Sequence, residues 1–225
     1  MIKEPREEII SHYSCTNNIA GLSLIQNEHI NIAIYERGIT KQIDSFLNHI
    51  LSKGFNTMKV SLNVGEFGSY FDSHFKDFRI NYTEAYNFLK NDIQELLQQF
   101  SKICSNDTLK VFFGIVDTDM CRRFHVDMYE LRMLCSYQGK GTTWLTDNNI
   151  NYEALNNFES NEEIAIKTEN VRQLNATDVA IIKGALYPNS KVGGLVHRSP
   201  TIEHLNEKRI VLRVDSNSLL DNINK

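Results

Sequence analysis

In Lys208-Arg-Ile-Val-Leu-Arg-Val-Asp215, every second residue from Ile210 to Val214 is apolar, and the alternate positions from 209 to 213 include two arginines. Side chains of a β-strand point to opposite faces in turn, so Arg209, Val211 and Arg213 share one face. The apolar residues Ile210, Leu212 and Val214 take the other face. The stretch therefore predicts a strand with an apolar side and a side that carries two arginines.

Short β-type runs of this kind continue through the second half of the chain. They cover residues 109–116, 121–126, 131–137, 164–167, 179–183 and 209–214. Glycines punctuate them at positions 139, 141, 184, 193 and 194, and residues 152–157 are the one brief helical candidate. Many short strands with glycine-rich turns favour a sandwich or barrel of the jelly-roll type over a parallel sheet.

The first half has a different period. Apolar residues recur at helical spacing over 40–52 and 83–104, while 30–35 and 57–64 are β-type runs. We therefore expect an α+β fold in a single domain over residues 1–225. In it, residues 1–107 form a helical and mixed supporting part, and residues 108–225 form the β core with the functional site.

Composition excludes several classes of protein. The 24 basic and 28 acidic side chains give a formal charge of −4, which is not the basic footprint of a nucleic-acid-binding protein. No apolar run has the length of a membrane helix, and residues 1–8 do not resemble a signal peptide. The four cysteines lack a CxxC spacing, which favours reduced thiols. We expect a cytoplasmic protein with no nucleic-acid or membrane partner.

Two histidines and one aspartate form the candidate site. Within Cys121-Arg-Arg-Phe-His-Val-Asp127, His125 and Asp127 are two residues apart, so a strand would send both side chains to one face. His197 follows in Gly193-Gly-Leu-Val-His197, at the end of another β-type segment. Two histidines and one carboxylate are the facial triad that leaves open positions on Fe(II). We predict that His125, Asp127 and His197 are the metal ligands and the catalytic centre.

The two arginines of the last strand have two interpretations. A guanidinium binds a carboxylate in a bidentate manner and keeps its charge when enclosed, so Arg209 or Arg213 would suit a carboxylate anchor. The same stripe is equally typical of the solvent-facing side of an edge strand.

These residues carry two resemblances. His125-x-Asp127, His197 and the arginine at 209 or 213 resemble the pattern of Fe(II)/2-oxoglutarate-dependent dioxygenases. Separately, almost the whole chain resembles an uncharacterised bacterial family known only as a domain of unknown function. The segments that carry this second likeness are 31–37, 124–127, 137–145, 183–188 and 197–200.

The dioxygenase resemblance implies a cupin-like double-stranded β-helix that uses Fe(II) and takes 2-oxoglutarate as cosubstrate. It implies that an arginine binds the cosubstrate, with Arg209 favoured over Arg213. It also implies that Tyr137, Thr142 and Trp144 border the cosubstrate pocket. The small-molecule or peptide substrate and the oligomeric state are not specified by it.

Two other functions fit the same residues. A cupin-like protein would hold zinc or iron without 2-oxoglutarate, for example in metal homeostasis. A non-catalytic protein on this fold would use the pocket for recognition alone. An oxygenase needs all three ligands and an arginine, whereas a zinc site does not need the arginines.

Overall fold

The computed structural model describes residues 12–78 and 82–216. The segment 1–8, in which no signal peptide was expected, lies outside the described residues. Among the described helices, none has the length and apolar character needed to cross a membrane.

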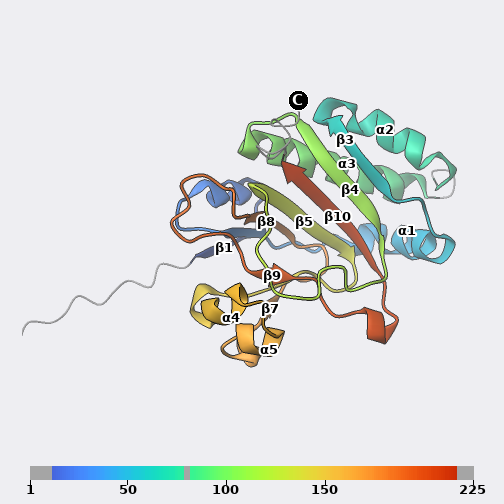
Figure 1. Cartoon of the computed structure of the whole chain (residues 1–225). Helices are drawn as coiled ribbons and strands as arrows, with labels where there is room; N and C mark the ends of the chain where they lie inside the picture. Colours follow the sequence, from blue (N-terminus) through green and yellow to red (C-terminus); the bar gives the residue numbers. More distant parts are fainter. Residues whose placement is uncertain (1–11, 79–81, 217–225) are drawn as a thin grey trace, which may run out of the picture.

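Seven strands form the main sheet, which runs through the centre of the molecule (Figure 1). Their order across the sheet is β1 (Tyr13–Thr16), β2 (Ile32–Tyr35), β8 (Val179–Lys183), β5 (Leu131–Gln138), β10 (Arg209–Ser216), β4 (Thr108–Val116) and β3 (Met58–Asn63). All neighbours are antiparallel except the pair β1 and β2. The expected division at residue 107 falls inside this sheet, because β1, β2 and β3 come from the first half.

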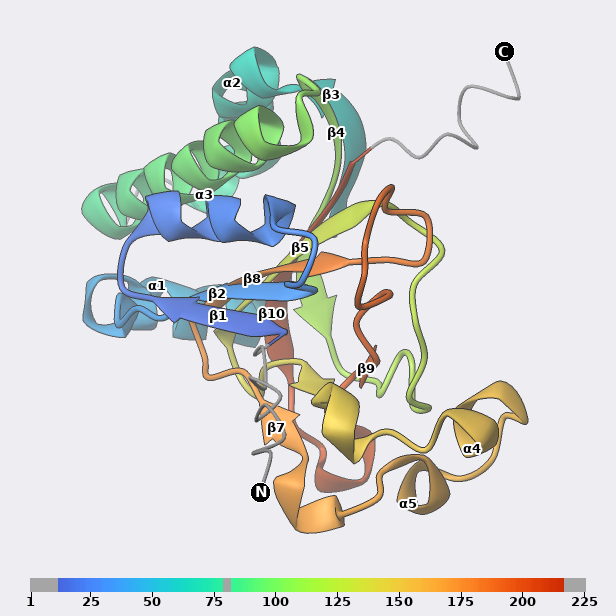
Figure 2. The ribbon, with the colours of Figure 1, turned by 90° about the vertical axis from the view of Figure 1, so that its left-hand side faces the viewer.

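Helices cover one face of the main sheet. The longest are α1 (Thr40–Lys53), α2 (Phe67–His74) and α3 (Thr83–Cys104), and the 3₁₀ helix η1 (Ile19–Gln26) lies beside α3 (Figure 2). The buried side chains of α3 recur every three or four residues, as in Leu89, Ile93, Leu96 and Phe100, and pack against Ile210, Leu212 and Val214 of β10. The apolar side of β10 therefore lies in the main core.

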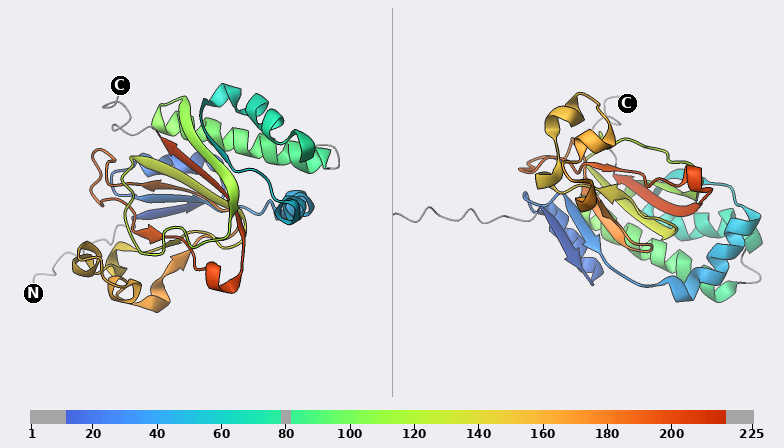
Figure 3. Two further views of the ribbon diagram at one scale, coloured as in Figure 1. Left: turned by 45° about the vertical axis from the view of Figure 1, so that its right-hand side comes forward. Right: turned by 90° about the horizontal axis from the view of Figure 1, so that it is seen from below.

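The opposite face of the main sheet faces a small second sheet. That sheet has the order β7 (Arg172–Gln173), β6 (Thr143–Trp144) and β9 (His197–Arg198). Trp144 of β6 joins Ile32, Leu134 and Ile182 of the main sheet in one buried cluster, so apolar side chains fill part of the space between the two sheets. The short helices α4 (Tyr152–Asn156) and α5 (Asn161–Ile164) lie beyond it, at the end far from α2 and α3 (Figure 3).

Short 3₁₀ turns complete the described elements. They are η2 (Val64–Glu66), η3 (Lys76–Phe78), η4 (Asp147–Asn149), η5 (Thr168–Asn170) and η6 (Glu203–Leu205).

Two expected strands do not form. Residues 121–126 are irregular, and their one ladder contact is an isolated bridge at His125. The expected strand at 164–167 is wrong because α5 occupies 161–164. The Ser160 side chain accepts a hydrogen bond from the Glu163 N–H, and the Glu163 side chain accepts one from the Ser160 N–H. This capping box starts a helix where the apolar pattern alone suggests a strand.

Candidate metal centre

The backbones of the two predicted histidine ligands are paired with each other. His125 and His197 form an isolated antiparallel bridge, in which each N–H donates to the other residue's carbonyl at 3.0 Å. The small sheet supplies His197 through β9, while His125 comes from the irregular segment after β4. Main-chain hydrogen bonds thus fix two distant parts of the sequence side by side.

Asp127 is held against the end of β8. Its carbonyl accepts a hydrogen bond from the Ala185 N–H at 2.8 Å. A Cβ atom added to Gly184 would lie 2.7 Å from this carbonyl and 2.0 Å from that of Tyr129. Glycine at position 184 is therefore what allows the segment that carries Asp127 to pack so closely.

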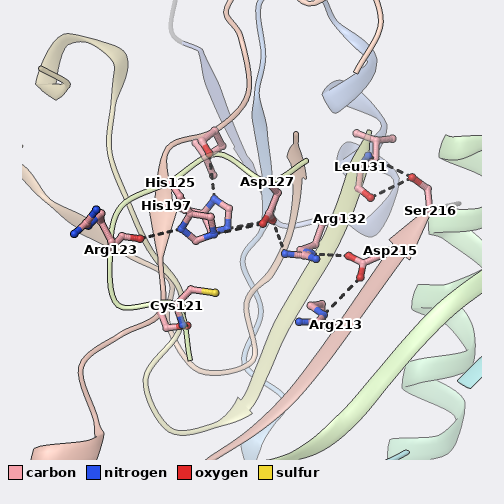
Figure 4. Close-up of polar contacts among 12 residues, drawn as sticks. Cys121, Arg123, His125, Asp127, Leu131, Arg132, His197, Arg213, Asp215 and Ser216 are labelled. Carbon is pink, nitrogen blue, oxygen red and sulfur yellow. Dashed lines mark hydrogen bonds and ion pairs between the residues drawn. The ribbon is translucent and has the colours of Figure 1, made fainter. Parts of the chain in front are cut away.

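The imidazole rings turn their Nε2 atoms toward Asp127 (Figure 4). Nδ1 of His125 lies 2.9 Å from the Arg123 carbonyl, and Nδ1 of His197 lies 3.1 Å from the Leu195 carbonyl. A carbonyl only accepts, so both Nδ1 atoms carry the proton. The Nε2 atoms lie 3.4 and 3.3 Å from the Asp127 carboxylate oxygens. In the neutral rings, three acceptor groups therefore face one another.

This arrangement fits a metal ion. The three potential ligand atoms all lie within 4.8 Å of one another. Lone pairs that face each other repel unless a cation or a proton lies between them. Two imidazole nitrogens and one carboxylate oxygen suit iron or zinc, and hydrogen-bonded Nδ1 atoms are typical of metal-ligating histidines.

Charges nearby keep Asp127 ionised. Burial alone would raise the pKa of its carboxyl. Where the Nε2 atoms of His125 and His197 are protonated, their hydrogen bonds to Asp127, together with the charges of His197 and Arg132, outweigh burial and hold the pKa of this carboxyl well below its usual range. In turn, the hydrogen bond to Asp127 raises the pKa of His125, although burial opposes that change.

Arg132 is a site residue that the sequence analysis missed. Its NH1 group donates to Asp127 Oδ2 and its Nε to Asp215 Oδ1, both at 2.5 Å (Figure 4). All three residues are buried. Arg132 joins β5 to Asp127 and to β10. A signal was present, since Arg132 is the one charged residue in the run Leu131-Arg-Met-Leu-Cys-Ser-Tyr137.

A small cavity lies beside the histidines, between β10 and β9. It has a volume of about 60 Å³, and its lining includes His125, His197, Leu134 and Val211. Phe112 and Arg213 line both this cavity and a groove of about 450 Å³ over β3 and β4, so the two spaces adjoin.

Three of the predicted cosubstrate residues line this cavity: Arg209, Thr142 and Arg213. β10 is an interior strand, and Arg209 is 4% exposed, so the interpretation as a solvent-facing edge stripe is wrong for it. Arg209 donates to the Ser136 hydroxyl at 2.9 Å, and its buried Nε has no acceptor among the described residues. Burial lowers the pKa of this guanidinium to about 10.

The other two predicted cosubstrate residues do not line the cavity. Tyr137 points to the helix side of β5, where its hydroxyl donates to Asp92 of α3 at 2.5 Å. Trp144 is buried between the two sheets and packs edge-on against Tyr13. Strand alternation explains Tyr137, because it shares a face with Cys135 and not with Arg132.

Residues 16–215 match the model of the family described as "Protein of unknown function (DUF1826)". The chain belongs to this family. No match was found among curated protein sequences. The description of the DUF1826 family carries no activity, so the fold and the site remain the evidence about function.

One solved structure shares the fold of this DUF1826 chain, and a second has a lower similarity. Dioxygenase for auxin oxidation 1 from Arabidopsis thaliana, a binary complex with 2-oxoglutarate, superposes with a TM-score of 0.50. The two are 8% identical, and the match covers 94% of each chain. A prolyl-4-hydroxylase from Pseudomonas putida is 7% identical, with a TM-score of 0.46 over 88% of this chain and 96% of that one. The DUF1826 chain thus has the expected α+β double-stranded β-helix fold.

Proposed function

We propose that this chain is an Fe(II)- and 2-oxoglutarate-dependent oxygenase. The observation that carries the proposal is the convergence of His125 Nε2, His197 Nε2 and the Asp127 carboxylate beside a cavity that contains Arg209. Similarity of the fold to 2-oxoglutarate oxygenases supports it.

The three ligands would hold the metal from one side. A facial set of two histidines and one carboxylate leaves adjacent positions open to a chelating cosubstrate and dioxygen. When bound, Fe(II) and 2-oxoglutarate would supply the electrons that activate dioxygen, which is the oxidant, and the protein supplies binding and orientation. The carbonyls of Arg123 and Leu195 fix the ring orientations, and Arg132 holds one oxygen of Asp127.

Arg209 would bind the distal carboxylate of 2-oxoglutarate. Its guanidinium is buried, already ordered by Ser136, and keeps an unbonded Nε. A fixed, desolvated guanidinium forms strong paired hydrogen bonds to a carboxylate. Thr142 lines the same cavity and offers a further hydroxyl.

The test is an anaerobic titration of metal-free protein with Fe(II) and then 2-oxoglutarate, monitored by visible absorption. We expect a charge-transfer band at one equivalent of each, lost in His125→Ala and retained in His204→Ala, a change at an exposed histidine outside the site. Iron binding without the band would replace the proposal with a metal-binding protein that does not use 2-oxoglutarate. If neither iron nor zinc binds, the proposal fails.

A further inference from the structure

The cavity beside the histidines is lined by four arginines. They are Arg132 of β5, Arg198 of β9, and Arg209 and Arg213 of β10. Among the described residues that line this cavity, none is a carboxylate. Such a concentration of guanidinium groups in a partly enclosed space is costly unless anions balance it.

Protein carboxylates balance only part of this charge. Arg132 is paired with both Asp127 and Asp215. The Nε of Arg213 is 3.6 Å from Asp215, which already accepts a hydrogen bond from Arg132.

Arg198 bonds only neutral groups in the part of the chain that the structure describes. It donates to the Ser199 carbonyl and the Thr201 hydroxyl, and it lies over the Phe124 ring. Burial lowers the pKa of Arg198, while the charges of Glu162 and Asp119 act against this from a distance. The buried Nε atoms of Arg198 and Arg213, like that of Arg209, have no acceptor among the described residues.

The surplus charge does not depend on the proposed cofactors. Four guanidiniums less the carboxylates of Asp127 and Asp215 leave a formal charge of 4 − 2 = +2. A divalent metal and the 2-oxoglutarate dianion would cancel each other, so the loaded site keeps the same surplus. With Arg209 assigned to the cosubstrate, Arg198 has no carboxylate partner among the described residues, and Arg213 shares Asp215 with Arg132.

We propose that the cavity binds a second oxyanion, a carboxylate or phosphate group of the substrate, through Arg198 and Arg213. The identification of that ligand as the oxidised substrate rests on the proposed function. The second anion subsite itself rests on the charges alone.

The layout of β10 separates the two anion subsites. Four residues along a strand span about 13 Å, so the backbones of Arg209 and Arg213 are well separated along β10, although both side chains line the cavity. Arg213 also lines the adjoining groove, where Lys59 and Lys110 accompany one carboxylate, that of Asp215, which is paired with Arg132. An anionic substrate would therefore approach over a cationic surface, and a neutral one would gain nothing from Arg198 and Arg213.

The test uses inorganic phosphate and acetate as probes in calorimetric titrations. The protein is loaded with Mn(II) and saturated with 2-oxoglutarate, so that the Arg209 subsite is filled. We expect saturable binding of at least one probe, and the stronger probe indicates the class of substrate. Arg198→Gln and Arg213→Gln should each raise its dissociation constant roughly tenfold or more, the usual effect of losing a charged hydrogen bond. Arg172→Gln, at an exposed arginine outside the cavity, should change it little.

Other outcomes separate this inference from the proposed function. Anion binding that persists in His125→Ala, a variant expected to lose iron, and that Arg198→Gln and Arg213→Gln still weaken, would uphold the second subsite even if the oxygenase proposal failed. If neither probe binds the wild-type protein, with or without metal, the inference is overturned. It is also overturned if Arg209→Gln abolishes probe binding while Arg198→Gln and Arg213→Gln do not. Arg213→Lys, which keeps the charge, guards against loss through misfolding and should retain part of the affinity.

Discussion

Some residues of the candidate site can be predicted from their spacing in the sequence. Others are recognised only from their contacts in the folded structure. His125, Asp127 and His197 can be found from the His-x-Asp pattern and a later histidine on a β-type segment. Arg132 cannot be assigned its role in this way, because its partner Asp215 is on a strand far along the chain. The His-x-Asp geometry survives without the expected strand, since the bridge to His197 replaces it.

Substitution of Arg132 should destabilise the metal-free protein strongly. Arg132→Met leaves two buried carboxylates, Asp127 and Asp215, without their shared cation, and loss of one partner from a buried ion pair costs about 3–5 kcal/mol. Urea denaturation with a chelator present, followed by the fluorescence of the single, buried Trp144, measures this. Arg132→Met combined with Asp215→Leu should recover part of the loss. A cost below about 1 kcal/mol for the single change would contradict the pairing.

Arg209 and Arg213 should differ in their effect on the cosubstrate. Arg209→Gln should weaken 2-oxoglutarate binding to the Mn(II) protein by roughly tenfold or more, because a charged hydrogen bond is lost. Arg213→Gln should leave that affinity within about threefold, since Arg213 lies at the groove end of the cavity. Calorimetric titration of both variants decides between them. The reverse ranking would assign the cosubstrate to Arg213.

At the scale of elements, long periodic segments can be predicted and very short ones cannot. The helix expected at 83–104 matches α3 because six turns of apolar spacing give a strong signal. The strands β6, β7 and β9 have two residues each, too few to show alternation, yet β9 supplies His197. The two-residue strands form through pairing with one another, which no local pattern records.

The hydrogen bond that joins β5 to α3 predicts a structural role for Tyr137. Its hydroxyl bonds Asp92, which also pairs with Arg37 at 2.5 Å. Tyr137→Phe should lower the free energy of unfolding by about 1.5–3 kcal/mol, the contribution of a hydrogen bond to a charged group. Affinity for 2-oxoglutarate should not change. The exposed Tyr152→Phe is the matched control for stability. If Tyr137→Phe weakened cosubstrate binding and left the free energy of unfolding unchanged, Tyr137 would have to be assigned to the cosubstrate pocket.

Lys183, at the end of β8, predicts that the stability of the protein depends on pH. Burial lowers the pKa of Lys183 from 10.5 to about 8, with a small opposing effect of Glu28, and its Nζ donates to the Asn27 carbonyl. Between pH 8 and 10.5 the unfolded chain binds a proton that the folded chain does not, so stability gains from rising pH. The unfolding free energy of wild type minus that of Lys183→Met should therefore increase across this window. If this difference in unfolding free energy did not change with pH, the pKa of the Lys183 amine would not be lowered in the folded protein.

At the scale of the whole molecule, the fold class followed from the sequence, but the way in which the halves combine did not. Strands from both halves share the main sheet, because β2 pairs with β8 and β3 with β4. Such pairing depends on contacts between residues far apart in the chain, which composition and periodicity do not encode. The helices on one face and the small sheet on the other leave the site between the two sheets.

Removal of metal should leave this architecture intact. The ligands sit on backbone that is paired independently of any ion, and the main core lies on the other side of the sheet. A chelator should therefore leave the far-ultraviolet circular dichroism spectrum unchanged while it abolishes Fe(II) binding. A chelator that unfolds the protein would show that the fold depends on the metal.

The reciprocal bridge between His125 and His197 has a consequence for metal exchange. When ligands are ordered beforehand, an arriving ion loses no affinity to the ordering of the chain, and a departing ion takes no structure with it. Loading and loss then become events confined to three side chains. At the metal site that we propose, the ion would therefore exchange with the free iron or zinc around the protein while the backbone keeps one conformation.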